Sequence, residues 1–109
     1  MRYALVVYRE EAAVPGTEAD QLAALNAFAR ELGDRLLDAT RLRPAATATK
    51  VQVRDGGLVI ADGPFAETKE QIGGFFIVEC ADLDEAIEVA SKHPLARRGA
   101  MELRPFGAD

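Results

Sequence analysis

The sequence predicts an α+β protein in which a ferredoxin-like split β-α-β sheet carries two helices on one face. Three observations lead to this prediction. Runs of β-branched and aromatic residues predict the strands, and two stretches with apolar residues at three- and four-residue steps predict the helices. Their order is strand, helix, strand and hairpin, then strand, helix, strand. Of the 109 residues 49% are hydrophobic and 28% are charged, so we expect residues 1–109 to form a single domain.

The first strand and the first helix occupy the N-terminal third of the chain. Residues 2–9 are dominated by Tyr, Val and Leu and predict a strand that ends before the turn dipeptide Pro15-Gly16. Thr17 is placed to cap a helix over about residues 18–32, with acids in the first turn where the helix dipole favours them. Gly33 is placed to end this helix.

The middle of the chain predicts a hairpin. Residues 36–43 can form a second strand before Pro44. Residues 51–54 alternate between apolar and polar types, Asp55-Gly56-Gly57 supplies a tight turn, and residues 58–60 continue as an apolar strand. The hairpin leads directly toward Asp62.

The C-terminal part repeats the order strand, helix, strand. Residues 74–80 are rich in Phe, Ile and Val and predict a strand. Asp82 and Glu85 have the spacing of a capping box, which predicts a helix over about residues 83–92. Residues 101–104 alternate again and close the chain as a strand.

Two helices on one face leave the other face of the sheet without a cover. The chain has no third helical pattern to supply one. We therefore expect a homodimer that packs sheet against sheet.

Composition and charge exclude several classes of function. The net charge of -5 repels phosphate backbones, so nucleic-acid binding is not expected. No segment approaches the roughly 20 apolar residues that span a bilayer, and the first apolar run is too short for a signal peptide. Cys80 is the single cysteine and has no partner for an internal disulfide. We expect a cytoplasmic protein.

The segment from Asp62 to Glu70 is the strongest candidate for a functional site. It reads Asp-Gly-Pro-Phe-Ala-Glu-Thr-Lys-Glu and places a carboxylate, a turn and several polar groups between two apolar runs. Asp62 is a candidate general base, and Thr68, Lys69 and Glu70 are candidate ligand-binding residues. The structural alternatives are that Asp62 accepts backbone amides in the turn, that the charged residues form a solvated face, and that Thr68 caps a short helical turn.

The remaining reactive side chains favour structural roles. His93 is expected to be a helix-end or surface histidine, with a haem or metal ligand as the alternative. Cys80 is expected to be a buried thiol, with a reactive nucleophile as the alternative. Tyr3 and Tyr8 suit core or dimer-face positions. Because the sequence carries no phosphate loop, dinucleotide fingerprint or Ser-His-Asp signature, no cofactor and no metal are expected.

The basic residues are spread over several predicted elements. They are interpreted as solvated surface, with an anion-binding cleft as the alternative. The residues concerned are Arg41, Arg43, Lys50, Arg97, Arg98 and Arg104.

Taken together, the motifs resemble those of the DGPF, or YCII-related, domain family. The resemblance rests on four pieces: residues 62–70, the Gly-Gly-Phe-Phe run at 73–76, Asp-Leu-Asp-Glu-Ala at 82–86, and Glu-Leu-Arg-Pro at 102–105. It covers the C-terminal half densely, and the first strand is compatible with it. The resemblance implies a ferredoxin-like fold that dimerises into an α/β barrel with a cleft.

The resemblance also implies some chemistry. Some members of the family are regarded as enzymes because a histidine near the first helix pairs with an aspartate in the cleft. Here Asp62 corresponds to the aspartate, but the first helix carries only Gln21 and Asn26 as neutral polar groups. We therefore favour a binding protein for a small polar ligand in a cleft near Asp62. The alternatives are an acid-base enzyme that uses Asp62, and a regulatory module associated with sigma-factor signalling.

Overall fold

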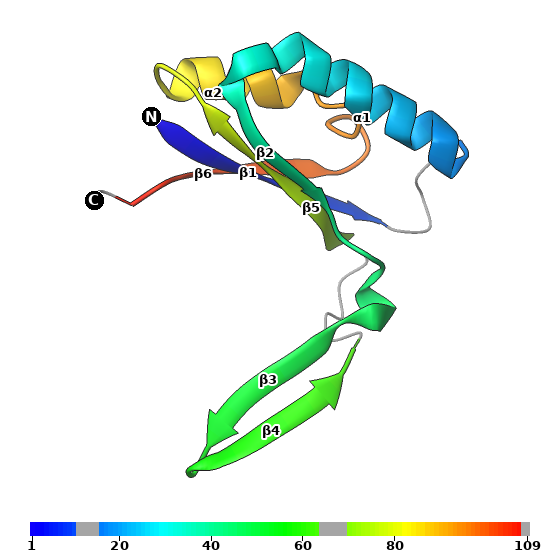
Figure 1. Ribbon diagram of the computed structural model, residues 1–109, viewed down its shortest axis with the longest axis vertical. Helices are drawn as coiled ribbons and strands as arrows, with labels where there is room; N and C mark the ends of the chain where they lie inside the picture. Colours follow the sequence, from blue (N-terminus) through cyan, green and yellow to red (C-terminus); the bar gives the residue numbers. More distant parts are fainter. Residues whose placement is uncertain (11–15, 64–69, 108–109) are drawn as a thin grey trace.

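A four-stranded antiparallel sheet forms the body of the protein in the computed structural model, which describes residues 1–10, 16–63 and 70–107. The strands lie in the order β2-β5-β1-β6, and β3 and β4 form a separate hairpin (Figure 1). This is the predicted split β-α-β arrangement, so the fold class is confirmed. The elements are β1 (Arg2–Glu10), α1 (Glu18–Leu32), η2 (Gly33–Arg35), β2 (Leu36–Arg41), η3 (Ala45–Thr47), β3 (Thr49–Arg54), β4 (Gly57–Asp62), β5 (Glu70–Glu79), α2 (Leu83–Ser91) and β6 (Ala100–Pro105).

The helix ends follow the local signals of the sequence. The Thr17 hydroxyl accepts a hydrogen bond from the Asp20 backbone N–H, and the Asp20 carboxylate accepts one from the Thr17 N–H, each at 3.1 Å. Gly33 ends α1 with a positive φ of 57°, which glycine adopts more easily than other residues. The Asp82 carboxylate accepts a hydrogen bond from the Glu85 N–H at 2.9 Å and caps α2. None of the helices in the described ranges is long and apolar enough to cross a membrane.

The core lies between the two helices and one face of the sheet. Side chains alternate along β1, so that Tyr3, Leu5 and Val7 are buried beneath the helices. Further core residues come from α1, β5, the end of β5, and α2, namely Phe28, Leu32, Phe76, Val78, Cys80, Ala86, Val89 and Ala90. Cys80 is 2% exposed, which confirms the expected buried thiol, and burial raises its pKa.

The opposite face of the sheet carries no helix in the part of the chain that the structure describes. Both helices lie on the same side of the sheet (Figure 1). On the other side Val6 lies opposite Phe75, and Ala4 lies opposite Ile77, all of them half-buried. Tyr8 belongs to the same alternation and is half-buried too. This open face is therefore a continuous apolar surface across the two central strands.

The β3–β4 hairpin projects away from the four-stranded sheet (Figure 1). Its two-residue turn has positive φ at both positions, 51° at Asp55 and 75° at Gly56, which matches the twist of the flanking strands. One face of the hairpin is apolar and exposed, since Val51 lies opposite Ile60 and Val53 lies opposite Leu58. The predicted hairpin is thus confirmed, although it stands outside the main sheet.

Candidate functional site

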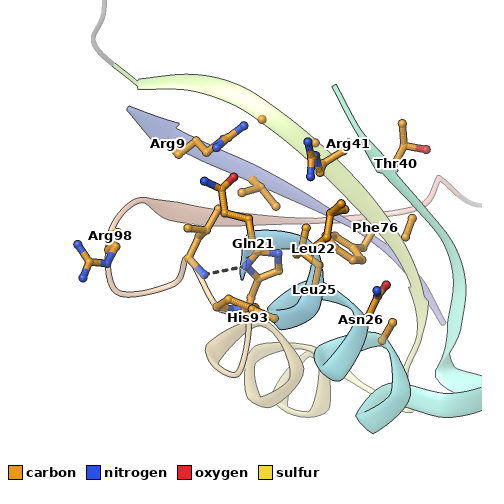
Figure 2. Close-up of a pocket in the computed structure, with 18 of the residues that line it drawn as sticks. Arg9, Gln21, Leu22, Leu25, Asn26, Thr40, Arg41, Phe76, His93 and Arg98 are labelled. Atoms are coloured by element: carbon orange, nitrogen blue, oxygen red, sulfur yellow. Dashed lines mark hydrogen bonds between the residues drawn. The ribbon is translucent and has the colours of Figure 1, made fainter. Parts of the chain in front are cut away.

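A pocket of about 420 Å³ lies between α1, the helix-facing side of the sheet and the segment after α2 (Figure 2). Leu22 and Leu25 of α1 line it on one side, and Val7 and Phe76 line it on the sheet. Polar side chains interrupt this apolar lining, and small-molecule sites commonly combine the two kinds of surface. The polar side chains are those of Arg9, Asp20, Gln21, Asn26, Thr40, Arg41, His93 and Arg98.

His93 lies just after the C-terminal end of α2 and lines the pocket from there. Its backbone N–H donates to Ala90 O at 3.1 Å, and its Nδ1 accepts a hydrogen bond from the Leu95 N–H at 3.0 Å. The ring packs edge-to-face against Phe28 and Phe76, with centroid distances of 5.0 and 5.1 Å. The side chain is only 4% exposed. The expected position at a helix end is therefore correct, but His93 is not a surface residue, because α1 and β5 enclose it.

The surroundings of His93 determine its protonation. Burial lowers its pKa to about 4, so the imidazole is neutral near pH 7. Since Nδ1 accepts from Leu95, the single ring proton resides on Nε2. Nε2 is buried and has no hydrogen-bond partner within the described residues. His93 thus holds an N–H donor that none of the described residues uses.

Three arginines line the same pocket. The side chain of Arg9 lies across Gly73, and a β-carbon at residue 73 would collide with it. The Arg41 guanidinium donates to the Glu18 carboxylate at 2.9 Å. Arg98 lines the pocket from the segment that follows α2. Arg41 and Arg98 were expected to be solvated surface, and although both are exposed, they also line the pocket.

Fewer acidic than basic side chains line the pocket among the described residues. Asp20 is the single carboxylate among the described residues that line the pocket, and it already belongs to the cap of α1. Hydrogen bonds from the Thr17 backbone and side chain lower the pKa of Asp20. The pocket therefore carries an excess of positive charge in a chain whose net charge is -5.

The residues predicted from the 62–70 segment lie elsewhere or outside the described ranges. Asp62 ends β4, is exposed, and lies opposite Thr49 at the base of the hairpin. Glu70 begins β5, is exposed, and lies opposite Glu10. Neither residue lines the pocket. Thr68 and Lys69 lie outside the described residues. The catalytic role of Asp62 and the ligand-binding roles of Thr68, Lys69 and Glu70 stay predictions.

Other predicted residues do reach the pocket. Gln21 and Asn26, the neutral polar groups of α1, both line it. Gly73 and Gly74 line it from β5, where a β-carbon at Gly74 would collide with the backbone oxygen of Thr40. Within the described ranges no three His, Cys, Asp or Glu residues are grouped in a way that could hold a metal ion.

Arg9 and His93 line the pocket, although the sequence analysis assigned neither of them to a small-molecule site. Arg9 continues the alternation of Tyr3, Leu5 and Val7, so the period of the strand already places it on the helix-facing side. No comparable local signal marks His93, because its burial depends on Phe28 and Phe76 from distant parts of the chain.

The sheet order, the two helices on one face and the pocket beneath α1 define a ferredoxin-like α+β protein with a cavity of small-molecule size. The family profile described as YCII-related domain matches residues 1–106. The chain belongs to the YCII-related domain family, as its motifs indicated.

The chain is also similar to two individual proteins. An uncharacterized protein of Rhizobium meliloti (strain 1021) is 34% identical over 114 residues, which cover 97% of this chain and 92% of the relative. A solved structure of 5-chloro-2-hydroxyhydroquinone dehydrochlorinase from Burkholderia phenoliruptrix AC1100, in complex with 2,5-dihydroxybenzoquinone, is similar with a TM-score of 0.58. Its sequence is 16% identical, and the match covers 100% of this chain and 96% of the other. At this identity the likeness shows a shared fold.

Proposed function

We propose that this YCII-related domain binds a small molecule with a flat apolar portion in the pocket between α1 and the sheet. The observation that carries the proposal is the cavity of about 420 Å³, which is apolar along Leu22, Leu25 and Phe76 and polar at a few positions. Small-molecule sites commonly combine these properties. The ligand site of this proposal lies at Gly73 and Gly74 rather than at Asp62.

The structural neighbour supports a ring-shaped ligand. That dehydrochlorinase was solved with 2,5-dihydroxybenzoquinone, a single-ring compound. The shared fold is therefore able to hold a molecule of this size in at least one protein.

Filling the pocket is expected to abolish binding. Ala24 and Ala27 are both exposed on α1, but only Ala24 lines the pocket. In a thermal-shift screen of a metabolite library, hits on the wild type should lose their shift in Ala24→Phe and keep it in Ala27→Phe. Hits that survive equally in both variants would contradict the pocket as the site.

Asp62→Asn in the same screen tests the alternative functions. Because Asp62 is exposed and outside the pocket lining, we expect the hits to persist in this variant. A hit that is lost in Asp62→Asn but kept in Ala24→Phe would instead favour acid-base chemistry or binding at the predicted segment. The association with sigma-factor signalling and the cytoplasmic location stay predictions.

We further propose that a second copy of the chain covers the open face of the sheet. The half-buried Ala4, Val6, Tyr8, Phe75 and Ile77 make this face apolar, and burial of such a surface favours association. A two-fold axis would pair the face with itself.

The oligomeric state tests this second proposal. Light scattering after size exclusion should give about twice the chain mass of 11.7 kDa for the wild type. Val6 lies between Phe75 and Glu102, so Val6→Glu should yield a monomer by placing like charges together at the centre of the open face. Ile87→Glu is the control, since Ile87 is 51% exposed on α2. A monomeric wild type would overturn the proposal.

A further inference from the structure

We propose that the ligand of the pocket is a small ring-containing monoanion whose anionic group pairs with Arg9 and whose second polar group accepts the Nε2–H of His93. This inference rests on the proposed function and specifies its ligand class. Figure 2 shows Arg9 and Arg41 on the sheet side of the pocket and His93 on the helix side, with Gln21 between them.

Arg9 is the residue suited to bind the anion. It is half-buried at the end of the helix-facing row of β1, and the absence of a side chain at Gly73 leaves room for it against β5. No ion pair of Arg9 is present among the described residues. A planar guanidinium presents several donors in a fork that matches a carboxylate. A half-buried arginine that pairs with no carboxylate of the described residues is thus available to the carboxylate of a ligand.

The charged side chains that line the pocket favour a ligand with one negative charge rather than two. Arg41 already donates to Glu18 at 2.9 Å, so its charge is largely compensated. Arg98 is exposed at the rim, where water screens it. Three arginines thus face two carboxylates, Asp20 in the pocket and Glu18 on Arg41, which leaves one positive charge in excess among the described residues. A monoanion such as a carboxylate matches this balance better than a phosphate dianion.

His93 supplies the second contact. Its Nε2–H is buried and unpaired within the described residues, and an unsatisfied buried donor costs about 1–3 kcal/mol. Nε2 is covered by the protein itself, so an oxygen acceptor on the ligand would satisfy it only after an enclosing side chain shifts. The imidazole is held as a neutral donor by the Leu95 N–H at Nδ1 and by its aromatic enclosure, so it recognises a hydroxyl or carbonyl oxygen as well as an anion.

The packing around His93 also defines the body of the ligand. Phe76 contacts the imidazole on the sheet side, and Leu22 and Leu25 line the pocket from α1. These surfaces favour a flat apolar ring between the two polar contacts, because aromatic faces and leucine side chains exclude water from such a group.

A set of four single-ring probes tests the inference by isothermal titration calorimetry. The probes are 4-hydroxybenzoate, benzoate, 4-hydroxybenzamide and benzamide. The wild type should bind each benzoate roughly tenfold or more tightly than the matching benzamide, as expected for a charge-assisted hydrogen bond. Arg9→Gln should remove this ratio, whereas Arg43→Gln should keep it, because Arg43 is exposed and does not line the pocket.

A second comparison of the probes tests the hydrogen bond from His93 to the ligand. The wild type should prefer 4-hydroxybenzoate over benzoate, and His93→Phe should lose this preference while keeping the preference for benzoates over benzamides. A preference that persists in His93→Phe would overturn the role of His93.

Failure of the inference and failure of the proposed function give different results. Benzoates and benzamides could bind with equal affinity, compete with each other and lose binding in Ala24→Phe. This result would overturn the preference for an anion, but it would support the pocket as the binding site. An anion preference that persists in Arg9→Gln would overturn the role of Arg9. No binding of any probe overturns the inference, and library hits unaffected by Ala24→Phe would overturn the proposed function itself.

Discussion

Acidification is expected to destabilise the protein through His93, and replacement of this residue is expected to remove that sensitivity. The imidazole titrates near pH 6.5 in the unfolded chain, whereas burial lowers its pKa to about 4 in the folded protein. Between these values the unfolded state binds more protons than the native state. The free energy of unfolding contributed by His93 therefore falls as the pH falls through this window, and it is constant above it.

The size of the effect follows from the shift. Since one pKa unit corresponds to about 1.4 kcal/mol, the loss between pH 6.5 and pH 4 approaches about 3 kcal/mol. Phe28 and Phe76 enclose the ring from α1 and β5, and they carry no charge that would oppose the lowering of the His93 pKa. The charged groups of the pocket are Arg9, Asp20, Arg41 and Arg98, and the lowered pKa of Asp20 keeps it ionised over most of this range.

Urea denaturation of the wild type and of His93→Phe at several pH values between about 4 and 7.5 measures this contribution. The other titrating groups are common to both proteins, so the difference between the two pH profiles isolates His93. His93→Phe should show the shallower dependence below pH 6.5, whatever its absolute stability. Parallel profiles would mean that His93 titrates normally and is solvated in the folded protein.

Gly74→Ala is expected to destabilise the sheet by about 3 kcal/mol, the upper part of the range for overpacking. A β-carbon at residue 74 would collide with the backbone oxygen of Thr40 on β2, and a backbone atom cannot move aside as a flexible side chain can. Gly74 lies opposite Arg41 in the β2–β5 pairing, so the collision acts directly on the ladder between these strands.

Gly107→Ala provides the matched control, because nothing lies within 4 Å of a β-carbon at that position. Its unfolding free energy should change by less than about 0.5 kcal/mol. Hydrogen exchange should also show loss of protection in β2 of Gly74→Ala, because the edge strand is the element displaced. Equal stability of both variants would show that β2 shifts without cost.

Much of the fold is predictable from short-range patterns, whereas the pocket is not. Thr17, Gly33 and the Asp55-Gly56 turn act through their own backbone neighbours, so their effects are visible in the sequence. The order of the elements then leaves few ways to build a sheet. Composition and order therefore predict the architecture with the helices on one face.

The site depends on contacts between distant segments. His93 is a helix-end residue by sequence, and only the packing of Phe28 and Phe76 makes it a buried donor. Asp62 stands in a conspicuous motif, yet the hairpin that carries it projects away from the sheet. Arg41 resembles an ordinary surface cation until the β2–β5 pairing places it beside the pocket. Local sequence marks turns well, but it does not indicate which side chains face a common cavity.

The position of the β3–β4 hairpin indicates which part of the chain can vary in length and sequence. Arg41 pairs with Gly74, and the Leu42 N–H donates to Gly73 O at 3.0 Å, so the chain leaves the sheet and returns to it at one point. The β3–β4 hairpin therefore lies within a connection between β2 and β5, which are adjacent antiparallel strands. Its length and sequence can vary without altering the register of the sheet or the core beneath the helices. The hairpin is thus a module that can be exchanged, shortened or extended while the pocket is retained.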